Sequence, residues 1–269
     1  MVSMHRCSDL SELDDLKTAY LQSLVAPMDG MWEAGFVPQA KHWKLKVRDQ
    51  PAGFCAITDE GALLQFFLLP AFEADGAAVL QHIAAQDSVN KAVVSTIDPF
   101  FLSLCLDAHK QVSTHTYMYE LGPDTETGNT LRTGAEFSQV SAAQLDRTVN
   151  FQRSCLGGDE SLTEWLRGYS GNLIERAELF VLHRGDEWIG LGECRKSDSQ
   201  EGVADVGMMV SHEHRREGWA TEILRRLKSR AMEADLRPIC STTVDNPAAQ
   251  KAIIRAGFAS HHRIMDVSL

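Results

Sequence analysis

The segment 215–221, Arg-Arg-Glu-Gly-Trp-Ala-Thr, combines residue types that suit the binding of a polyanion. Its two arginines supply positive charge, and Gly218 together with the small Ala220 lets a ligand approach the backbone closely. An apolar pattern with helical spacing follows, so unpaired N–H groups and the positive end of a helix dipole face the ligand. We interpret the segment as a loop that binds a pyrophosphate; for this segment alone, a solvated helix start is the simpler alternative.

The loop is expected between a strand and a helix in the second half of the chain. Alternating or continuous apolar runs predict strands at 178–184, 188–194, 203–210 and 238–244. Residues 220–234 have the spacing of a helix with one buried face, and Pro247 opens a second helix that Gly257 closes. These elements place the loop directly after one strand and directly before a helix.

The first half of the chain repeats this order of elements. Strands are predicted at 42–47, 53–58, 63–69 and 92–97, with helices at 76–85 and after Pro99. Pro99 and Pro247 are 148 positions apart, as are Ala108 and Ala256, and residues 122–129 form a polar, turn-rich linker. We therefore expect two domains, 1–124 and 125–269, although chance similarity of two αβ stretches is the alternative.

The combination of R-x-x-G-x-A after a strand with a later N-P-x8-A-G-F resembles the GNAT (GCN5-related) N-acetyltransferase superfamily. The matching residues are Arg215, Gly218, Ala220, Asn246, Gly257 and Phe258. The resemblance covers roughly residues 135–269 well. It implies an α/β (α+β) fold with two tandem GNAT-like domains, each a mixed, mostly antiparallel twisted sheet flanked by helices. The N-terminal domain looks like a second, degenerate copy of the same fold that has lost these motif residues.

The resemblance also implies acetyl-CoA as the co-substrate. In the family the first motif binds the pyrophosphate and the following strand–helix motif supplies an Asn near the pantetheine arm, which pairs like an extra strand where the sheet opens. Carried over to this chain, the cofactor-binding residues are Met208, Met209, Val210, Arg215, Arg216, Glu217, Gly218, Trp219, Ala220, Thr221 and Asn246.

The corresponding segment of the first half carries acidic residues. Glu73 stands where the second half has Arg215, and Asp75 precedes Gly76. A carboxylate beside a pyrophosphate repels it and offsets the helix dipole. We therefore expect the first half not to bind coenzyme A in this way, and to act as a packing partner or as one wall of the acceptor pocket.

Transfer of an acyl group to an amine needs a base, because an amine with a pKa near 10 is protonated at pH 7. Asp205 and Glu193 are the candidates, and Asp205 is preferred since the family often carries an acid in the corresponding strand. The backbone N–H of Met209 is our candidate for binding the oxyanion. Many relatives carry a Tyr seven positions after the Asn, where this chain has Ile253.

These residues predict an N-acetyltransferase that moves an acetyl group from acetyl-CoA to a primary amine of a small molecule or peptide. The predicted reaction is direct attack in a ternary complex. The alternative, motivated by Ile253 and the altered first half, is a noncatalytic acyl-CoA-binding or ligand-sensing protein.

Composition restricts the partners. The net charge of −11 and the pI near 5.4 oppose binding to nucleic acid or to an anionic membrane. No signal peptide or membrane span is evident, so a cytoplasmic protein is expected. The six cysteines are far apart, which predicts neither disulfides nor a metal site. The expected assembly is a monomer with an internal pseudo-dimer, or a homodimer.

Overall fold

The computed structural model describes residues 1–86, 89–123 and 134–269. The boundary expected between residues 124 and 125 lies outside the described residues. The chain divides into two compact units: unit 1 comprises residues 1–118 together with 262–269, and unit 2 comprises residues 119–261. The last eight residues thus fold with unit 1, a feature that the sequence repeat does not indicate.

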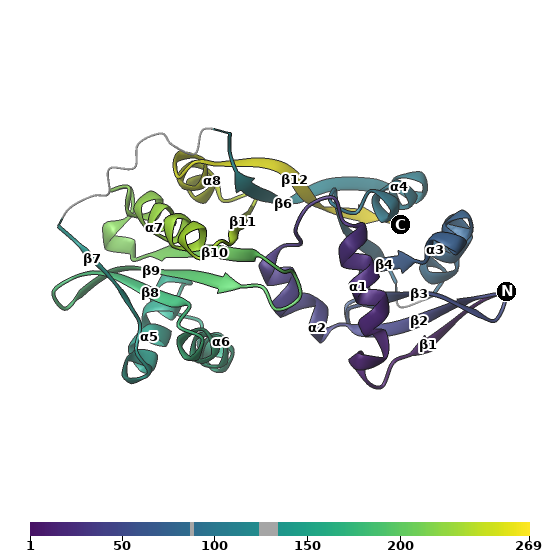
Figure 1. The fold of residues 1–269 in the computed structure, drawn as a ribbon, viewed down its shortest axis with the longest axis horizontal. Helices are drawn as coiled ribbons and strands as arrows, with labels where there is room; N and C mark the ends of the chain where they lie inside the picture. The colour runs from purple at the N-terminus through teal and green to yellow at the C-terminus, as the bar shows by residue number, and fades with distance from the viewer. Residues whose placement is uncertain (87–88, 124–133) are drawn as a thin grey trace. The chain divides into compact units, whose positions relative to one another are not determined.

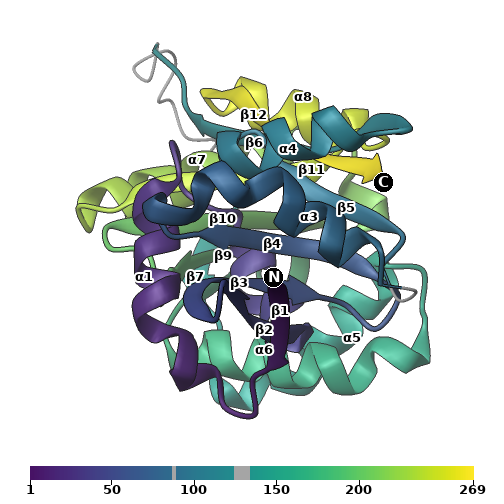
Figure 2. The ribbon, with the colours of Figure 1, turned by 90° about the vertical axis from the view of Figure 1, so that its right-hand side faces the viewer.

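Unit 1 is a sheet with helices on both faces (Figures 1 and 2). Its main elements are β1 (Val2–Arg6), α1 (Asp14–Ser23), α2 (Val37–Gln39), β2 (Lys41–Val47), β3 (Gln50–Ile57), β4 (Ala62–Leu68), α3 (Gly76–Ala84), β5 (Lys91–Ser95), α4 (Pro99–Ala108) and β6 (Gln111–Leu121). The strands β1 to β5 lie in sequence order, and Ile264–Ser268 of β12 (Phe258–Ser268) pairs antiparallel with β5. Tyr20 of α1 packs with Phe54 and Phe67 on one face, while α3 and α4 cover the other.

Unit 2 has the same succession of elements. They are β7 (Glu136–Gln139), α5 (Leu145–Cys155), α6 (Thr163–Glu175), β8 (Leu179–Arg184), β9 (Glu187–Lys196), β10 (Val203–Val210), α7 (Trp219–Glu233), β11 (Arg237–Thr243) and α8 (Pro247–Arg255). Neighbouring strands run antiparallel except β10 and β11, which are parallel. Helices α5 and α6 cover one face and α7 the other (Figure 1). The prediction of two similar αβ units, each with a mixed, mostly antiparallel sheet, is confirmed.

In both units, the sheet opens between its two parallel strands. In unit 2, residues 203–205 of β10 pair with 237–239 of β11, and the pairing ends there. In unit 1, only residues 62–63 of β4 pair with 91–92 of β5. The backbone of β10 beyond Asp205 therefore faces an opening in the sheet, at the place expected for the pantetheine arm.

The remaining expectations about the chain as a whole concern thiols and membrane spans. All six cysteines are free. Among the described residues, no helix combines the length and the apolar character that crossing a membrane requires.

Candidate functional site

The predicted phosphate loop has a backbone shaped for an anion. After β10, a short 3-10 turn at His212–His214 leads to residues 215–218, and α7 begins at Trp219. Arg216 and Gly218 both have left-handed backbones, with φ of 68° and 87°. Gly218 is the N-cap of α7 and no side chain caps the helix. Successive N–H groups at a turn that opens a helix form an anion-binding concavity.

Two side chains of the loop hold its shape. The Arg215 guanidinium donates to the backbone carbonyls of Val210, at 3.4 Å, and Cys155, at 3.3 Å, which ties the loop to the ends of β10 and α5. Trp219 is fully buried, and its indole N–H donates to Glu217 at 2.8 Å. Arg215 therefore supports the loop through its contacts as well as adding charge, a role the sequence did not show.

Hydrogen bonds at the two ends of the β9–β10 ladder fix which backbone groups face the opening. The Ser197 N–H donates to the Val203 carbonyl, and the Ser211 N–H donates to the Ile189 carbonyl. Because the register is unbroken from Ala204 to Val210 and hydrogen-bonded pairs alternate, odd-numbered residues of β10 direct their N–H and C=O groups at β9. Even-numbered residues direct theirs to the other side, toward the opening.

This alternation corrects the expectation for Met209. Met209 lies opposite Leu191, so its N–H belongs to the β9–β10 ladder and is not directed at the opening. The backbone groups of Val206 and Met208 face the opening instead. Spacing along a sequence shows which side chains share a face, but the phase of the hydrogen bonds depends on the register with the partner strand.

A carboxylate lies beside the open part of β10. Glu193 of β9 is paired in register with Gly207, and the Tyr169 hydroxyl of α6 donates to Glu193 Oε2 at 3.0 Å. A Cβ atom at Gly207 would lie 2.6 Å from Glu193 Oε1. Glycine at this position therefore gives the carboxylate the room that it occupies.

Asp205 has a different environment from the one expected. It lies opposite Arg195 in the register, at the last position where β10 still pairs with β11. Both side chains are buried, and Arg195 Nη2 is 3.9 Å from Asp205 Oδ2. A buried carboxylate beside a guanidinium mainly balances that charge. Among the two candidate bases, the geometry therefore favours Glu193 over Asp205.

The surroundings of Glu193 tune its proton affinity. Burial raises the pKa of the Glu193 carboxyl, while the Tyr169 hydrogen bond and the Arg195 charge act in the opposite direction. Burial, and next the Glu193 charge, raise the pKa of the Tyr169 hydroxyl, which keeps its proton and remains a donor. A carboxylate whose pKa is raised toward neutrality is better suited to accept a proton from an amine.

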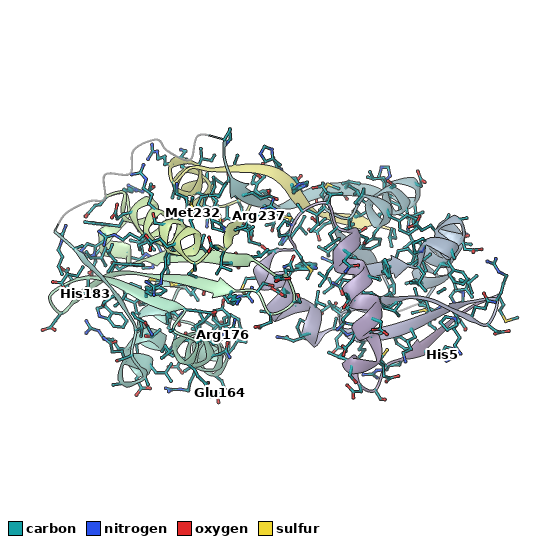
Figure 3. All side chains as sticks on the ribbon, in the orientation of Figure 1. His5, Glu164, Arg176, His183, Met232 and Arg237 are labelled. Carbon is teal, nitrogen blue, oxygen red and sulfur yellow. The ribbon has the colours of Figure 1, made fainter. Side chains whose placement is uncertain are left out.

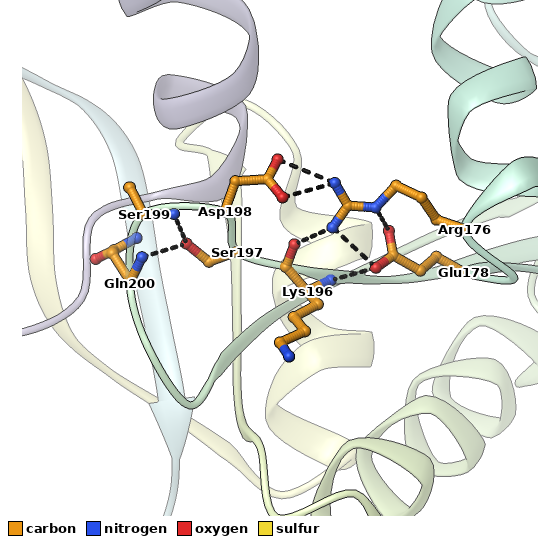
Figure 4. A network of polar contacts seen from close by, with 7 residues as sticks. All are labelled: Arg176, Glu178, Lys196, Ser197, Asp198, Ser199 and Gln200. Atoms are coloured by element: carbon orange, nitrogen blue, oxygen red, sulfur yellow. Dashed lines mark hydrogen bonds and ion pairs between the residues drawn. The ribbon is translucent and has the colours of Figure 1, made fainter. Parts of the chain in front are cut away.

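A network of ion pairs fixes the strand that carries Glu193 (Figure 4). Arg176 contacts Asp198 through Nη1 at 2.7 Å and Glu178 through Nε at 2.9 Å. Glu178 in turn accepts the Lys196 backbone N–H at 3.0 Å. The network joins the end of α6 to the end of β9. It therefore holds together the two elements that carry Tyr169 and Glu193.

The second predicted motif forms the start of α8. The Asn246 side chain accepts the Ala249 N–H at 3.1 Å and so caps the helix. Thr221 donates to the Ala252 carbonyl at 3.4 Å, which links α7 to α8. Ile253 is buried in the core. The assignment of Asn246 to a pantetheine arm remains a prediction, and position 253 offers no proton donor.

Unit 1 lacks the geometry of the phosphate loop. Residues Pro70–Asp75 form a 3-10 helix that continues directly into α3, and Gly76 has a φ of −51°. Between residues 69 and 76, all of which are described, no backbone is left-handed. The Asp75 carboxylate forms a two-bond contact with Arg48 at 2.8 and 2.9 Å. These features fit the expectation that the first half does not hold a pyrophosphate in this way.

One group of side chains within the described residues has a spacing that suits a metal ion. Glu187, Glu213 and His214 offer ligand atoms within 4.8 Å of one another. Both glutamates are exposed; His214 Nε2 lies 3.4 Å from Glu187 Oε1, and Ser211 Oγ lies 2.9 Å from His214 Nδ1. The contacts of His214 with Glu187 and Ser211 account for this arrangement, so we assign no metal to it.

Comparison with known proteins identifies both halves of the chain. Two family models, both described as "Acetyltransferase (GNAT) domain", match residues 9–121 and 140–259. No protein of curated function matches the sequence significantly.

Solved structures match the whole chain. An acetyltransferase of the GNAT family from Colwellia psychrerythraea is 36% identical, with a TM-score of 0.92 over 99% of both chains. A GCN5-related N-acetyltransferase from Sphaerobacter thermophilus is 12% identical, with a TM-score of 0.68 over 99% of this chain and 95% of that one. A tandem GNAT protein from the clavulanic acid biosynthesis pathway is 14% identical, with a TM-score of 0.65 over 100% and 98% of the two chains. The latter two show the fold alone.

Proposed function

Since the chain belongs to the GNAT acetyltransferase family, we propose that unit 2 transfers an acetyl group from acetyl-CoA to a primary amine. The observation that carries the proposal is the position of Glu193. Its carboxylate lies beside Gly207, in the part of β10 where the sheet is open, and the anion-shaped loop follows the same strand. The proposed base, the opening for the donor and the proposed phosphate loop thus lie beside β10 or directly after it.

The loop is proposed to bind the pyrophosphate of acetyl-CoA. The N–H groups from Arg216 to Thr221 and the positive end of α7 supply the attraction, and the left-handed Arg216 and Gly218 orient those groups. The amides of the pantetheine arm are proposed to bond with the backbone groups of Val206 and Met208, which face the opening.

Glu193 is proposed to act as the general base. It removes a proton from the ammonium form of the acceptor, and the neutral nitrogen then attacks the thioester carbon to form the N–C bond and an oxyanion. The nitrogen gives its second proton to water, and collapse of the oxyanion breaks the C–S bond and releases the thiolate. The Met208 N–H, in place of that of Met209, is the proposed hydrogen-bond donor to the oxyanion. One such donor contributes a factor of about 10² to 10³ to the rate in other enzymes. The leaving thiolate takes its proton from water, because a thiol with a pKa of about 8.5 needs little assistance and Ile253 offers none.

A thiol-release assay with acetyl-CoA and a panel of primary amines tests the proposal. We expect release of free coenzyme A that depends on the amine. Gly218→Glu is expected to abolish acetyl-CoA binding, whereas Arg167→Glu, the corresponding kind of change on the exposed face of α6, is expected to leave it unchanged. Binding of acetyl-CoA without thiol release for any amine would instead establish the noncatalytic alternative.

A further inference from the structure

An aromatic pair extends from the Glu193 carboxylate to the protein surface along α6. The ring of Trp165 stacks on that of Tyr169, with centroids 5.1 Å apart and an angle of 7° between the planes. The Tyr169 hydroxyl donates to Glu193. Trp165 is 43% exposed although one face of its ring is covered by Tyr169. The uncovered part of the ring is therefore exposed to solvent.

The surface beside this ring is open and carries the exposed carboxylate of Glu164, while the nearby Arg167 guanidinium is paired with Asp146. A Cβ atom at Gly168 would meet no atom within 4 Å, so no side chain fills the space one turn after Trp165. Glu164, labelled near the start of α6 in Figure 3, is exposed and lies four residues before Gly168, on the same side of the helix. Within the described part of the chain, no salt bridge involves Glu164.

We propose that Glu164, Trp165 and Gly168, which we name the α6 subsite, bind a second positive charge of the acceptor. This inference rests on the proposed function and adds the substrate class: a diamine, whose reacting nitrogen lies at Glu193 and whose other nitrogen lies over the Trp165 ring. A cation is attracted to the face of an indole ring, and the Glu164 carboxylate adds to that attraction.

The charges favour a cation over an apolar group as the occupant. An apolar group would cover Trp165 equally well, but it would bring the Glu164 carboxylate no partner and would bury part of its hydration. A cation satisfies both groups. It also remains partly hydrated at this exposed position, so its desolvation costs little.

The test compares linear alkyl diamines with monoamines of equal chain length as acceptors in the thiol-release assay. We expect a higher kcat/KM for diamines at one range of chain lengths, through a lower KM. In Trp165→Ala, the diamine KM is expected to rise about two- to fivefold, the size of a cation–π contact at an exposed ring, while the monoamine KM and the acetyl-CoA affinity stay unchanged. Trp165→Phe is expected to restore most of the preference.

Glu164→Gln is expected to weaken the same preference and to make it less sensitive to salt. Two matched controls are Glu175→Gln, an exposed acid at the other end of α6, and Met232→Ala, an exposed apolar side chain of α7 (Figure 3). Neither control is expected to change the ratio of diamine to monoamine efficiency. Melting temperatures of all variants show whether each is folded.

Each outcome decides the inference. Equal kcat/KM for diamines and monoamines, or a loss in Trp165→Ala that is the same for both, overturns the α6 subsite and leaves the proposed function intact. A Trp165→Ala loss confined to monoamines with apolar tails shows an apolar subsite instead and also overturns the inference. Absence of turnover with every amine overturns the proposed function and this inference together.

Discussion

Asp98 of unit 1 is a buried acid whose ionisation opposes folding. It is 6% exposed and caps α4 by accepting the Phe101 N–H at 3.1 Å. It borders a small cavity of about 20 Å³, room for roughly one water molecule. Burial raises its pKa from 3.8 to about 6. In the unfolded chain the carboxyl regains its ordinary pKa.

The sign of the effect follows from proton binding. Between pH 4 and pH 6 the folded state binds more protons than the unfolded state, so the free energy of unfolding falls as the pH rises through this range. At 1.36 kcal/mol per pKa unit, the loss reaches about 3 kcal/mol above pH 6. Asp98→Asn removes this loss and keeps the cap, since Asn246 caps α8 in the same way.

Urea unfolding at pH 4.5 and pH 8 measures the effect. We expect Asp98→Asn to unfold at higher urea than the wild type at pH 8, by a free energy of up to about 3 kcal/mol, with a much smaller difference at pH 4.5. Asp159→Asn, an exposed cap of unit 2 whose pKa is lowered by its bonds to Ser161, serves as the control and is expected to be neutral or destabilising. An identical pH dependence in Asp98→Asn and the wild type would refute the reasoning.

Three further predictions concern the site of unit 2. Tyr169→Phe removes a hydrogen bond that lowers the Glu193 pKa, so this pKa rises and the acidic limb of the kcat profile moves to higher pH; an unmoved limb contradicts the pairing. Gly207→Ala displaces the Glu193 carboxylate, and we expect kcat to fall at least about tenfold, whereas Gly171→Ala, where a Cβ meets open space, leaves kcat unchanged. Gly218→Ala, at a φ of 87°, is expected to weaken acetyl-CoA binding and to lower the free energy of unfolding by about 1 kcal/mol; calorimetric titration and urea unfolding test both, and unchanged affinity contradicts the loop assignment.

The sequence predicted the features that depend on local order. The strands, the helices and the similar order of elements in the two halves follow from spacing and periodicity, and these elements lie within a few residues of the expected bounds. The loss of the loop in the first half was also visible, because Glu73 and Asp75 replace the residues that would attract an anion.

Features that depend on packing were missed. Helix α6 carries Gly168 and Gly171 in its interior, which weakens the helical pattern, so no pattern in the sequence joins Tyr169 to Glu193. The aromatic pair Trp165 and Tyr169, at a helical spacing of four, was the one local signal.

The register of β10 with β9 and the pairing of β12 with β5 could not be predicted from local patterns either. The choice of Met209 failed because the phase of the ladder is set by β9, and the preference for Asp205 ignored Arg195 on that strand. The pairing of β12 with β5 joins residues about 170 positions apart, which no local pattern encodes.

The rate of thiol release by Glu193→Gln, measured beside its affinity for acetyl-CoA, tests the central claim most directly. The substitution keeps the size of the side chain and removes only its ability to take a proton. We predict that kcat falls by about 10²-fold or more, that the acidic limb of the pH profile disappears, and that the acetyl-CoA affinity stays within about twofold, since the loop is untouched. A Glu193→Gln protein with the rate and pH profile of the wild type would contradict the account.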